Sequence, residues 1–395
     1  MNITIYPGKL SGAVQAVPSK SYAHRLLICS AFADRETVID CFQTSDDIDA
    51  TIRCLNALGA DIQAIDGGYR VIPVSSVPES AALHCGESAS TLRFLLPVAC
   101  ALGVNATFIM GDSLSKRPLS PLWELLESRG CTLTRHSETA FTASGKLCAG
   151  DLSIDGSISS QFISGLLLAA GLTDGTSRVI IPGTTVSAPY IAMTQQVLSI
   201  FSANNGITSK YPFHSPGKVC VEGDWSNSAF FLAANALGSD IAVTGLNKDS
   251  LQGDREILKH LSPTDKPIQI SAGHIPDLVP ILAVIYGSKG GAVFTDVGRL
   301  RLKESDRIAS ISKMLNAFGI TTQATEDTLT VLPGTYHGCT VDAMGDHRIA
   351  MATAIAATVA DGPVTVLGAE CVSKSYPVFW QIYKALGGKY EQHLR

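Results

Sequence analysis

The eight residues LRLKESDR, at positions 300–307, place five ionisable side chains in a single short segment. If a helix begins within this segment, Lys303, Glu304 and Arg307 lie at its N-terminus, where the partial positive charge is about half a unit. Two cations at such a position favour an anion, and a carboxylate beside them could transfer a proton. The alternative interpretation is a solvated, charged helix cap, and the octapeptide alone does not separate the two.

A helix start inside this segment is predicted by the residues themselves. Ser305 is a suitable N-cap and Asp306 suits a first helical turn, because both satisfy unpaired backbone N–H groups. Apolar residues then recur at helical spacing as far as Phe318. We therefore expect a helix over residues 306–318, with the charged residues at its start.

Composition limits the classes of protein that this chain can belong to. Of its 395 residues, 46% are hydrophobic and 16% charged, which is enough apolar material for a large core. The net charge of -5 argues against a nucleic-acid partner or a membrane surface. The ten cysteines are scattered without a C-x-x-C pair, which is typical of reduced thiols in a cytoplasmic protein. The sequence has no run of about 18 apolar residues and MNITIYPGKL is not apolar, so we expect neither a transmembrane helix nor a signal region.

The chain repeats one theme about every 50–70 residues, a spacing longer than that of solenoid repeats. A short strand meets small and polar residues, which open a helix that is apolar nearly all round and is therefore expected to be buried. The six starts are Ser21, Ser88, Ile158, Ser226, Ile275 and Asp346.

A second set of helices has one apolar face and ends at glycine, as a left-handed cap requires. These helices are expected near residues 46–60, 121–130, 190–206, 305–319 and 376–388. Strand-like segments such as 68–74 and 327–333 separate the two sets. The fourth repeat is short, because residues 254–270 leave room for only one helix and one strand.

Six repeats suggest two similar lobes of three, with chain crossings at residues 16–19 and 220–224, where Pro or Gly interrupts strand-like residues. We expect a first lobe over residues 20–221 and a second lobe formed by residues 1–19 and 222–395. The six buried helices could then point their polar N-termini at one cleft between the lobes.

The residues at these helix starts are mostly cations and hydroxyls, with few carboxylates, a combination typical of sites for small molecules with several negative charges. The cations and hydroxyls include Lys20, Ser21, Arg25, Ser159, Ser160, Ser187, Arg348 and Lys374. Individually, each has a structural alternative: Ser159 and Ser160 could be plain caps, and Arg93 within an apolar helix is better explained as a core residue. No group of residues has metal-ligand spacing, and no dinucleotide or P-loop motif occurs, so we expect neither metal nor cofactor.

Taken together, the motifs resemble the 5-enolpyruvylshikimate-3-phosphate synthase (3-phosphoshikimate 1-carboxyvinyltransferase) family of enolpyruvyl transferases. The resemblance runs along the whole chain and is carried by PSKSYAHR (18–25), TSDDIDATIRCLNALGA (44–60), CGESASTLRFL (85–95), KRPL (116–119), SSQFISGLLLAA (159–170), VSAPYI (186–191), QGD (252–254), IPD (275–277), LRLKESDR (300–307) and GDHRIAMA (345–352). It implies a mixed α/β (α+β) fold of two lobes, each with three βαβαββ units, which agrees with the six repeats.

The family's reaction moves the enolpyruvyl group of phosphoenolpyruvate to the 5-hydroxyl of shikimate 3-phosphate and releases phosphate. The resemblance implies that shikimate 3-phosphate is held by Lys20, Ser21, Arg25, Ser159, Ser160, Gln161, Ser187, Asp277 and Lys303. It implies that phosphoenolpyruvate is held by Lys20, Ala89, Arg117, Gln161, Arg307, Arg348 and Lys374.

The chemistry that the resemblance implies is acid–base and electrostatic catalysis without a covalent enzyme intermediate. Asp277, with Lys303, would accept the proton of the 5-hydroxyl, and Glu304 would exchange protons with the methylene carbon of phosphoenolpyruvate. Lys20 would be the further catalytic group. The product would serve chorismate and aromatic amino-acid biosynthesis, and we expect a cytoplasmic monomer whose partners are these two small molecules.

Two residues depart from the family pattern. Ala89 stands where many members have glycine, and its added methyl group should crowd the inhibitor glyphosate more than the substrate. Ala188 stands where many members have a cation, so one positive charge near the shikimate pocket would be missing.

Two rival functions remain at this point. The sister enzyme that uses UDP-N-acetylglucosamine as acceptor usually has a reactive cysteine before its Arg-Pro pair, but GDSLSKR at 111–117 has none. A non-catalytic anion-binding protein would not need both Asp277 and Glu304 beside its cations.

Overall fold

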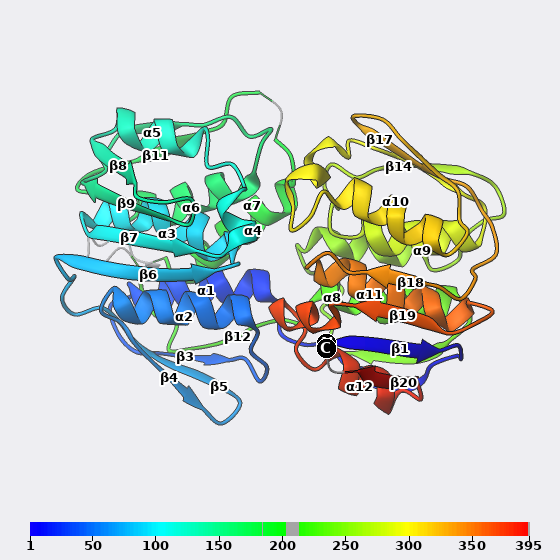
Figure 1. Ribbon diagram of the computed structural model, residues 1–395. Coiled ribbons are helices and arrows are strands. Elements are labelled where there is room, and N and C mark those ends of the chain that lie inside the picture. Colours follow the sequence, from blue (N-terminus) through cyan, green and yellow to red (C-terminus); the bar gives the residue numbers. More distant parts are fainter. Residues whose placement is uncertain (184, 203–212, 394–395) are drawn as a thin grey trace. The chain divides into compact units, whose positions relative to one another are not determined.

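The computed structural model describes residues 1–183, 185–202 and 213–393, and it divides the chain into two compact units (Figure 1). The first lobe is Pro18–Glu222, and the second lobe is Met1–Val17 together with Gly223–Arg395. Compared with the expected 20–221, the first lobe begins two residues earlier, at Pro18, and ends one residue later, at Glu222. Each lobe buries its own continuous set of apolar side chains.

The first lobe contains two four-stranded sheets and one strand pair within its described residues. One sheet has the order β12 (Lys218–Cys220), β3 (Thr37–Asp40), β5 (Gly68–Ile72) and β4 (Asp61–Ile65). The other has the order β6 (Ser80–Gly86), β7 (Asn105–Met110), β9 (Ala140–Gly145) and β8 (Cys131–Arg135). The pair is β10 (Asp151–Ser153) with β11 (Arg178–Ile180).

The second lobe has the same make-up. One sheet has the order β18 (Thr340–Asp342), β19 (Val364–Leu367), β1 (Asn2–Tyr6) and β20 (Lys389–His393). The other has the order β14 (Ile268–Ser271), β15 (Ala292–Thr295), β17 (Thr328–Val331) and β16 (Thr322–Ala324). Its strand pair is β13 (Asp240–Thr244) with β2 (Ser11–Gln15).

All four larger sheets share one pairing pattern, a parallel pair at one edge followed by two antiparallel pairs. In two of them the chain runs as a contiguous βαβαββ repeat: β6, α3, β7, α5, β8, β9 and β14, α9, β15, α10, β16, β17. The shared pattern is the structural form of the sequence repeat.

Three helices that are buried nearly all round occupy each lobe, as the apolar repeats predict. In the first lobe they are α1 (Lys20–Ala31), α3 (Ala89–Leu102) and α6 (Ser160–Ala170). In the second lobe they are α8 (Trp225–Ala236), α9 (Val279–Ser288) and α11 (His347–Ala356). Within the second lobe, Figure 1 shows α9 and α11 between the sheet of β14 and β17 and the sheet of β1 and β19.

The amphipathic helices of the second predicted set are also present. They are α2 (Asp46–Ala57), α5 (Leu122–Ser128), α7 (Ala188–Ile200), α10 (Arg307–Ala317) and α12 (Phe379–Ala385). Shorter helices are α4 (Asp112–Ser115), η2 (Gly298–Leu302), η3 (Ala357–Val359) and η4 (Ala369–Lys374). The predicted glycine stop after α7, at 204–206, lies outside the described residues.

The short fourth repeat contains the expected helix, which is a 3₁₀ helix. Residues Gly253–His260 form a 3₁₀ helix, η1, and they bury Asp254, Ile257 and His260. That spacing of three is the period of a 3₁₀ helix, so one edge of it faces the core. Residues 261–267 then lead to β14, and β13, the strand before η1, pairs with β2.

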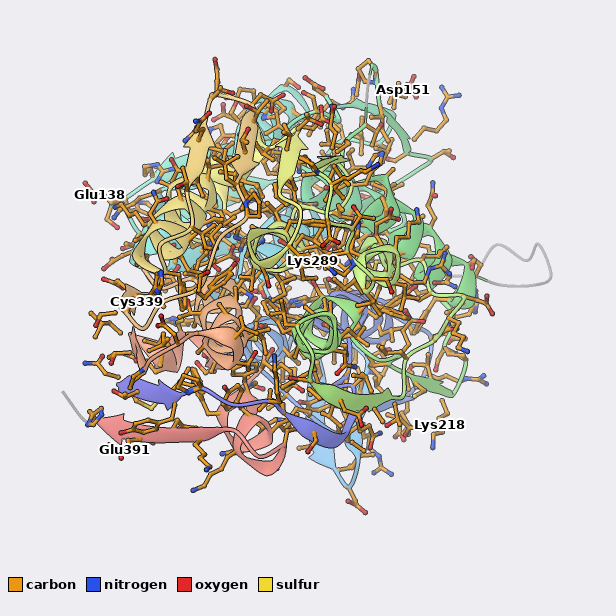
Figure 2. All side chains as sticks on the ribbon, turned by 90° about the vertical axis from the view of Figure 1, so that its right-hand side faces the viewer. Glu138, Asp151, Lys218, Lys289, Cys339 and Glu391 are labelled. Atoms are coloured by element: carbon orange, nitrogen blue, oxygen red, sulfur yellow. The ribbon has the colours of Figure 1, made fainter. Side chains whose placement is uncertain are left out.

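Charged side chains away from the helix starts are mostly exposed. Lys218 on β12 pairs with Asp40 on the neighbouring strand β3 at 3.0 Å, and Lys218 points into solvent (Figure 2). All ten cysteines are free, and six are buried, whereas Cys148 and Cys220 are exposed. Within the described ranges, no helix is both long enough and apolar enough to cross a membrane.

Candidate active site

The charged segment before α10 begins the site of the second lobe. The helix starts at Arg307, and its N-cap is Asp306, whose carboxylate accepts the backbone N–H of Ala309 at 3.1 Å. The expected cap at Ser305 is wrong, because the Ser305 hydroxyl donates to Asp346 at 3.2 Å instead. A carboxylate is the better group for the positive end of a helix, and Asp306 takes that place.

Arg307 is completely buried and is held by three carboxylates. Its guanidinium donates to Asp346 at 2.9 Å, to Asp277 at 2.8 Å and to Glu304 at 2.5 Å. A fourth hydrogen bond, to the other oxygen of Asp346, is 3.3 Å long. Burial lowers the pKa of Arg307, but the three carboxylates outweigh burial and raise it above its ordinary value. Four of the five guanidinium N–H groups are therefore used within the lobe.

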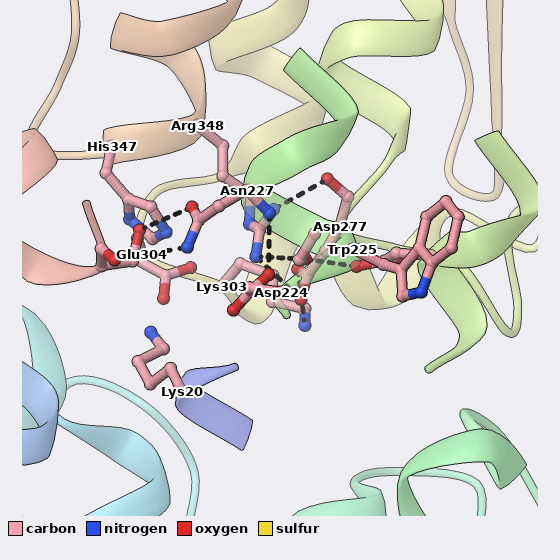
Figure 3. A network of polar contacts seen from close by, with 12 residues as sticks. Lys20, Asp224, Trp225, Asn227, Asp277, Lys303, Glu304, His347 and Arg348 are labelled. Atoms are coloured by element: carbon pink, nitrogen blue, oxygen red, sulfur yellow. Dashed lines mark hydrogen bonds and ion pairs between the residues drawn. The ribbon is translucent and has the colours of Figure 1, made fainter. Parts of the chain in front are cut away.

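Asp277 lies in the turn before α9, which starts at Val279, later than the expected Ile275. Pro280 has no N–H and is tolerated only in the first turn of a helix, which fits this later start. Its carboxylate contacts Lys303 at 3.4 Å and Arg348 at 3.4 Å, in addition to Arg307 (Figure 3). Burial raises the pKa of Asp277, but these cations more than compensate and hold it well below its ordinary value. Asp277 is therefore ionised at neutral pH.

At Lys303, in contrast, burial has a larger effect on the pKa than the neighbouring charges. Burial lowers its pKa below the ordinary lysine value, and the attraction of Asp277 only partly offsets this. A buried ammonium whose pKa is lowered gives up its proton more readily. Lys303 and Asp277 thus form a pair in which one proton could be exchanged.

The start of α11 supplies the next groups. Asp346 is its N-cap, and Arg348 reaches back so that its guanidinium donates to the Asp277 carbonyl at 3.3 Å and to Ser226 at 2.8 Å. Met344, just before this start, has a φ of 52°, a left-handed backbone that is rare outside glycine and is often found at functional sites. Lys374 is buried at the end of η4, which packs against α11.

The second lobe therefore contradicts one sequence inference, that the helix starts carry few carboxylates. Asp277, Glu304 and Asp346 surround Arg307, and Asp254 is buried nearby against Ser226. The inference failed because the carboxylates come from separate segments and gather only when the helices pack.

The first lobe has a different electrostatic character. Arg25 is buried, and its guanidinium bonds to the hydroxyls of Thr194 (2.7 Å) and Ser164 (3.2 Å) and to the carbonyls of Ser21 (2.6 Å) and Tyr190 (3.0 Å). None of these four partners is charged. Burial therefore lowers the pKa of Arg25 to about 10. Its retained positive charge favours a nearby anion.

Lys20 is the first residue of α1, and its ammonium pairs with Asp47 on α2 at 2.7 Å. Ser21 follows Lys20 in the first turn of the helix. The predicted residues Lys20, Ser21 and Arg25 are thus on one helix, and Asp47 is a carboxylate neighbour of Lys20 that the sequence alone does not single out.

The starts of α3 and α6 lie together. Gln161 accepts a hydrogen bond from Arg93 at 2.8 Å and donates to Ser90 at 2.9 Å. This close packing depends on Gly165, where an added Cβ would lie 2.2 Å from the Arg93 carbonyl oxygen. Arg93 is a core residue, as predicted, and it also orients Gln161.

The remaining predicted residues of the first lobe lie at or beside helix starts. Ala89 is the first residue of α3 and is buried. Ser159 is the N-cap of α6, and Ser160 is its first residue. Ser187 precedes α7 with a φ of 52°, again a left-handed conformation, and Ala188 is exposed beside it.

Arg117 follows the short helix α4, whose start is tied to Glu87. The carboxylate of Glu87 accepts the backbone N–H groups of Ser113 (3.1 Å) and Leu114 (2.7 Å). An added Cβ at Gly111 would overlap Glu87, so the glycine permits this contact. Glu87 comes from the segment before α3 and yet caps α4, a contact that the sequence alone does not reveal.

Comparison with known proteins identifies the family. Residues 5–383 match the family described as EPSP synthase (3-phosphoshikimate 1-carboxyvinyltransferase). The 3-phosphoshikimate 1-carboxyvinyltransferase of Clostridium botulinum is 36% identical, over 98% of this chain and 98% of its own length. This chain belongs to the EPSP synthase family.

Other similar proteins agree with this assignment. The 3-phosphoshikimate 1-carboxyvinyltransferase of Clostridioides difficile is 35% identical, over 99% of this chain and 98% of its own length. The solved EPSP synthase of Acinetobacter baumannii has a TM-score of 0.77 and 25% identity, with 99% of this chain and 100% of that chain covered. The enolpyruvyl transferase NikO of Streptomyces tendae, 18% identical with a TM-score of 0.76 over 99% of this chain and 98% of that one, shares the fold.

Proposed function

We propose that this member of the EPSP synthase family transfers the enolpyruvyl group of phosphoenolpyruvate to the 5-hydroxyl of shikimate 3-phosphate and releases phosphate. The family match over residues 5–383 carries the proposal. The cluster of Asp277, Lys303, Glu304 and Arg307 supports it, because it provides both proton-transfer groups and positive charge. The product would enter chorismate and aromatic amino-acid biosynthesis.

Shikimate 3-phosphate would be bound mainly by the first lobe. Its phosphate and carboxylate need cations and N–H or O–H donors when they are removed from water. Lys20, Ser21, Arg25, Ser159, Ser160, Gln161 and Ser187 would supply them. Asp277 and Lys303 would be its further contacts, at the 5-hydroxyl.

Phosphoenolpyruvate would be bound by cations. These are Lys20, Arg117, Arg307, Arg348 and Lys374, with Gln161 and Ala89 as further contacts. Because Arg307 already holds Glu304, a substrate carboxylate at Arg307 would compete with that carboxylate. Substrate binding would thereby release Glu304 for its catalytic role.

The proposed reaction is an addition followed by an elimination. Glu304 would protonate the methylene carbon, C2 would become electrophilic, and the 5-hydroxyl would add as Asp277 and Lys303 take its proton. The tetrahedral intermediate would expel phosphate as Glu304 takes the methyl proton back. Lys20 and the arginines would stabilise the developing negative charge.

We also propose that the enzyme works as a cytoplasmic monomer without metal or cofactor. Scattered free cysteines support a reducing compartment. Monomeric state would be measured by light scattering on the purified chain.

The deciding experiment is phosphate release from phosphoenolpyruvate with shikimate 3-phosphate as acceptor and with UDP-N-acetylglucosamine as competitor. The expected result is release with shikimate 3-phosphate alone. Release only with UDP-N-acetylglucosamine would contradict the assignment. Binding of shikimate 3-phosphate without any release would favour the anion-binding alternative.

The proton roles need a second measurement. Glu304→Gln and Asp277→Asn would be followed by deuterium exchange from solvent into the methylene group of phosphoenolpyruvate. If Glu304 acts on this carbon, Glu304→Gln abolishes the exchange. Exchange that survives in Glu304→Gln would assign the step to another group.

A further inference from the structure

A buried carboxyl group outside the predicted site contacts it through one hydroxyl. Asp254, on η1, is 2% exposed. Its Oδ2 accepts a hydrogen bond from the Ser226 hydroxyl, and its Oδ1 has no hydrogen-bond partner within the described ranges. A buried carboxylate oxygen without a partner is costly, so the position is not explained by stability alone.

The direction of the hydrogen bonds around Ser226 follows from chemistry. Arg348 donates to the Ser226 oxygen at 2.8 Å, and a guanidinium can only donate. The single hydroxyl proton of Ser226 is then directed to Asp254. The order is Arg348 to Ser226 to Asp254, and it runs from α11 through the first turn of α8 to η1.

We propose that Asp254 is a positioning residue that orients the Arg348 guanidinium through the Ser226 hydroxyl and so sets the affinity for phosphoenolpyruvate. This inference rests on the proposed function, in which Arg348 binds that substrate. Asp254 itself makes no contact with the substrate in this scheme. Asp254 acts on the orientation of the Arg348 guanidinium and on how much of its positive charge is available to the substrate.

The protonation of Asp254 makes this effect dependent on pH. Burial, followed by the charge of Asp277, raises the pKa of Asp254 to about 7, against the opposing influence of Arg348 and Ser226. Asp224, the cap of α8, also faces Asp254 and raises this pKa.

The charged groups on η1 itself are engaged elsewhere. Glu256 pairs with Lys259 at 2.7 Å, Arg255 bonds to the Lys248 carbonyl, and His260 contacts the Tyr286 hydroxyl on α9 at 2.9 Å. Asp254 is thus the ionisable group of η1 whose protonation changes the electrostatic environment of Arg348.

The direction of the pH effect follows. Below about pH 7 Asp254 is neutral, and the charge of Arg348 is available to an anionic substrate. Above that pH Asp254 is ionised and competes with the substrate for Arg348. The KM for phosphoenolpyruvate should therefore rise as pH increases through this range, and substrate binding should favour proton uptake by the same linkage.

The test compares wild type, Asp254→Asn and Asp249→Asn, with KM for phosphoenolpyruvate measured between about pH 6 and about pH 8. Asp254→Asn keeps the shape and the acceptor for Ser226 but cannot ionise. Asp249 is exposed on the segment before η1, so Asp249→Asn makes the same charge change away from Arg348. Titration of the substrate phosphates affects all three enzymes equally.

We expect the ratio of the wild-type KM to the Asp254→Asn KM to increase about fivefold or more across this range. Asp249→Asn should follow wild type, and Ser226→Ala should raise KM more than it lowers kcat. Infrared spectra should show a protonated-carboxyl band that titrates in wild type and is missing in Asp254→Asn. A wild-type pH profile retained in Asp254→Asn, or an equal loss of kcat at every pH, would overturn the inference while leaving the transferase assignment intact. A wild type without turnover would overturn both.

Discussion

Asp277 is the residue on which the charge balance of the second lobe depends. Three cations, Lys303, Arg307 and Arg348, face one carboxylate, and each contact is 3.4 Å or shorter. Removing its charge leaves these cations together in a poorly solvated place. The same change removes the group that we propose as proton acceptor, so activity and stability should both respond.

Asp277→Asn should lower kcat by about 10²–10⁴-fold, the range expected for loss of a general base. It should also lower the thermal unfolding temperature at neutral pH. The pKa of Asp277 is below its ordinary value of 3.8 in the folded protein, so its stabilisation is present above that pH and is lost as pH falls further. The difference in stability from wild type should therefore shrink in acid.

The control for this prediction is Asp265→Asn. Asp265 is an aspartate of the same lobe whose side chain is 82% exposed. It should leave kcat and the unfolding temperature near wild type, since exposed ion pairs contribute little. Full activity of Asp277→Asn would remove Asp277 from the mechanism.

Ala89 predicts the response to glyphosate. It is the first residue of α3 and is buried, so its methyl group has little room to move. Wild type should be weakly inhibited, and Ala89→Gly should lower the glyphosate inhibition constant about tenfold, because overpacking by one methyl group costs about 1–3 kcal/mol.

Inhibition curves at fixed phosphoenolpyruvate would measure this effect. Ala99→Gly, at a buried position further along α3, controls for the general weakening of the helix by glycine. Tight inhibition of wild type by glyphosate would show that the prediction is wrong.

At the scale of the elements, polar caps decide where the site residues are placed. Ser88, Ser159, Asp224, Asp306 and Asp346 each accept a backbone N–H from the first turn of their helix. In each case the cap fixes the start of a helix whose first residues carry proposed substrate contacts or support them.

Asp306 allows this capping to be measured. Asp306→Ala should lower the free energy of unfolding by about 1 kcal/mol. Asp306→Asn should keep most of the stabilisation that the cap provides, because asparagine is an equally good cap. Both variants lose the half-exposed pair with Arg301, so their difference isolates the cap. Chemical denaturation of the two variants would give that difference, and equal stabilities would contradict the assigned cap.

At the scale of the whole molecule, each lobe has a hydrophobic core of its own. Pro18–Glu222 is one continuous stretch of chain, whereas the second lobe joins Met1–Val17 to Gly223–Arg395. A continuous segment with its own core meets the usual conditions for independent folding.

The fragment 18–222 should therefore fold when expressed alone and unfold cooperatively on heating. Circular dichroism during thermal unfolding would measure this, and calorimetry with shikimate 3-phosphate would show whether the cations of this lobe bind the acceptor weakly by themselves. A fragment without a thermal transition would show that the first lobe needs the second in order to fold.

Much of this architecture could be predicted from the sequence because it depends on neighbours in the chain. Apolar spacing, polar starts and glycine stops predicted the helices, and the repeats predicted two lobes of similar make-up. Motifs such as LRLKESDR and SSQF indicated the family. Two errors were local: the cap at Ser305 instead of Asp306, and the start of α9 at Ile275 instead of Val279.

Only the tertiary structure decided which charges neutralise one another. Arg307 meets Asp346 across 39 positions of the chain, and Arg348 meets Ser226 across 122. Such pairs are created by helix packing, and no local pattern encodes them. For that reason the sequence determined which side chains stand at the helix starts, whereas folding determined that Arg307 is enclosed by carboxylates and that Arg348 is linked to Asp254.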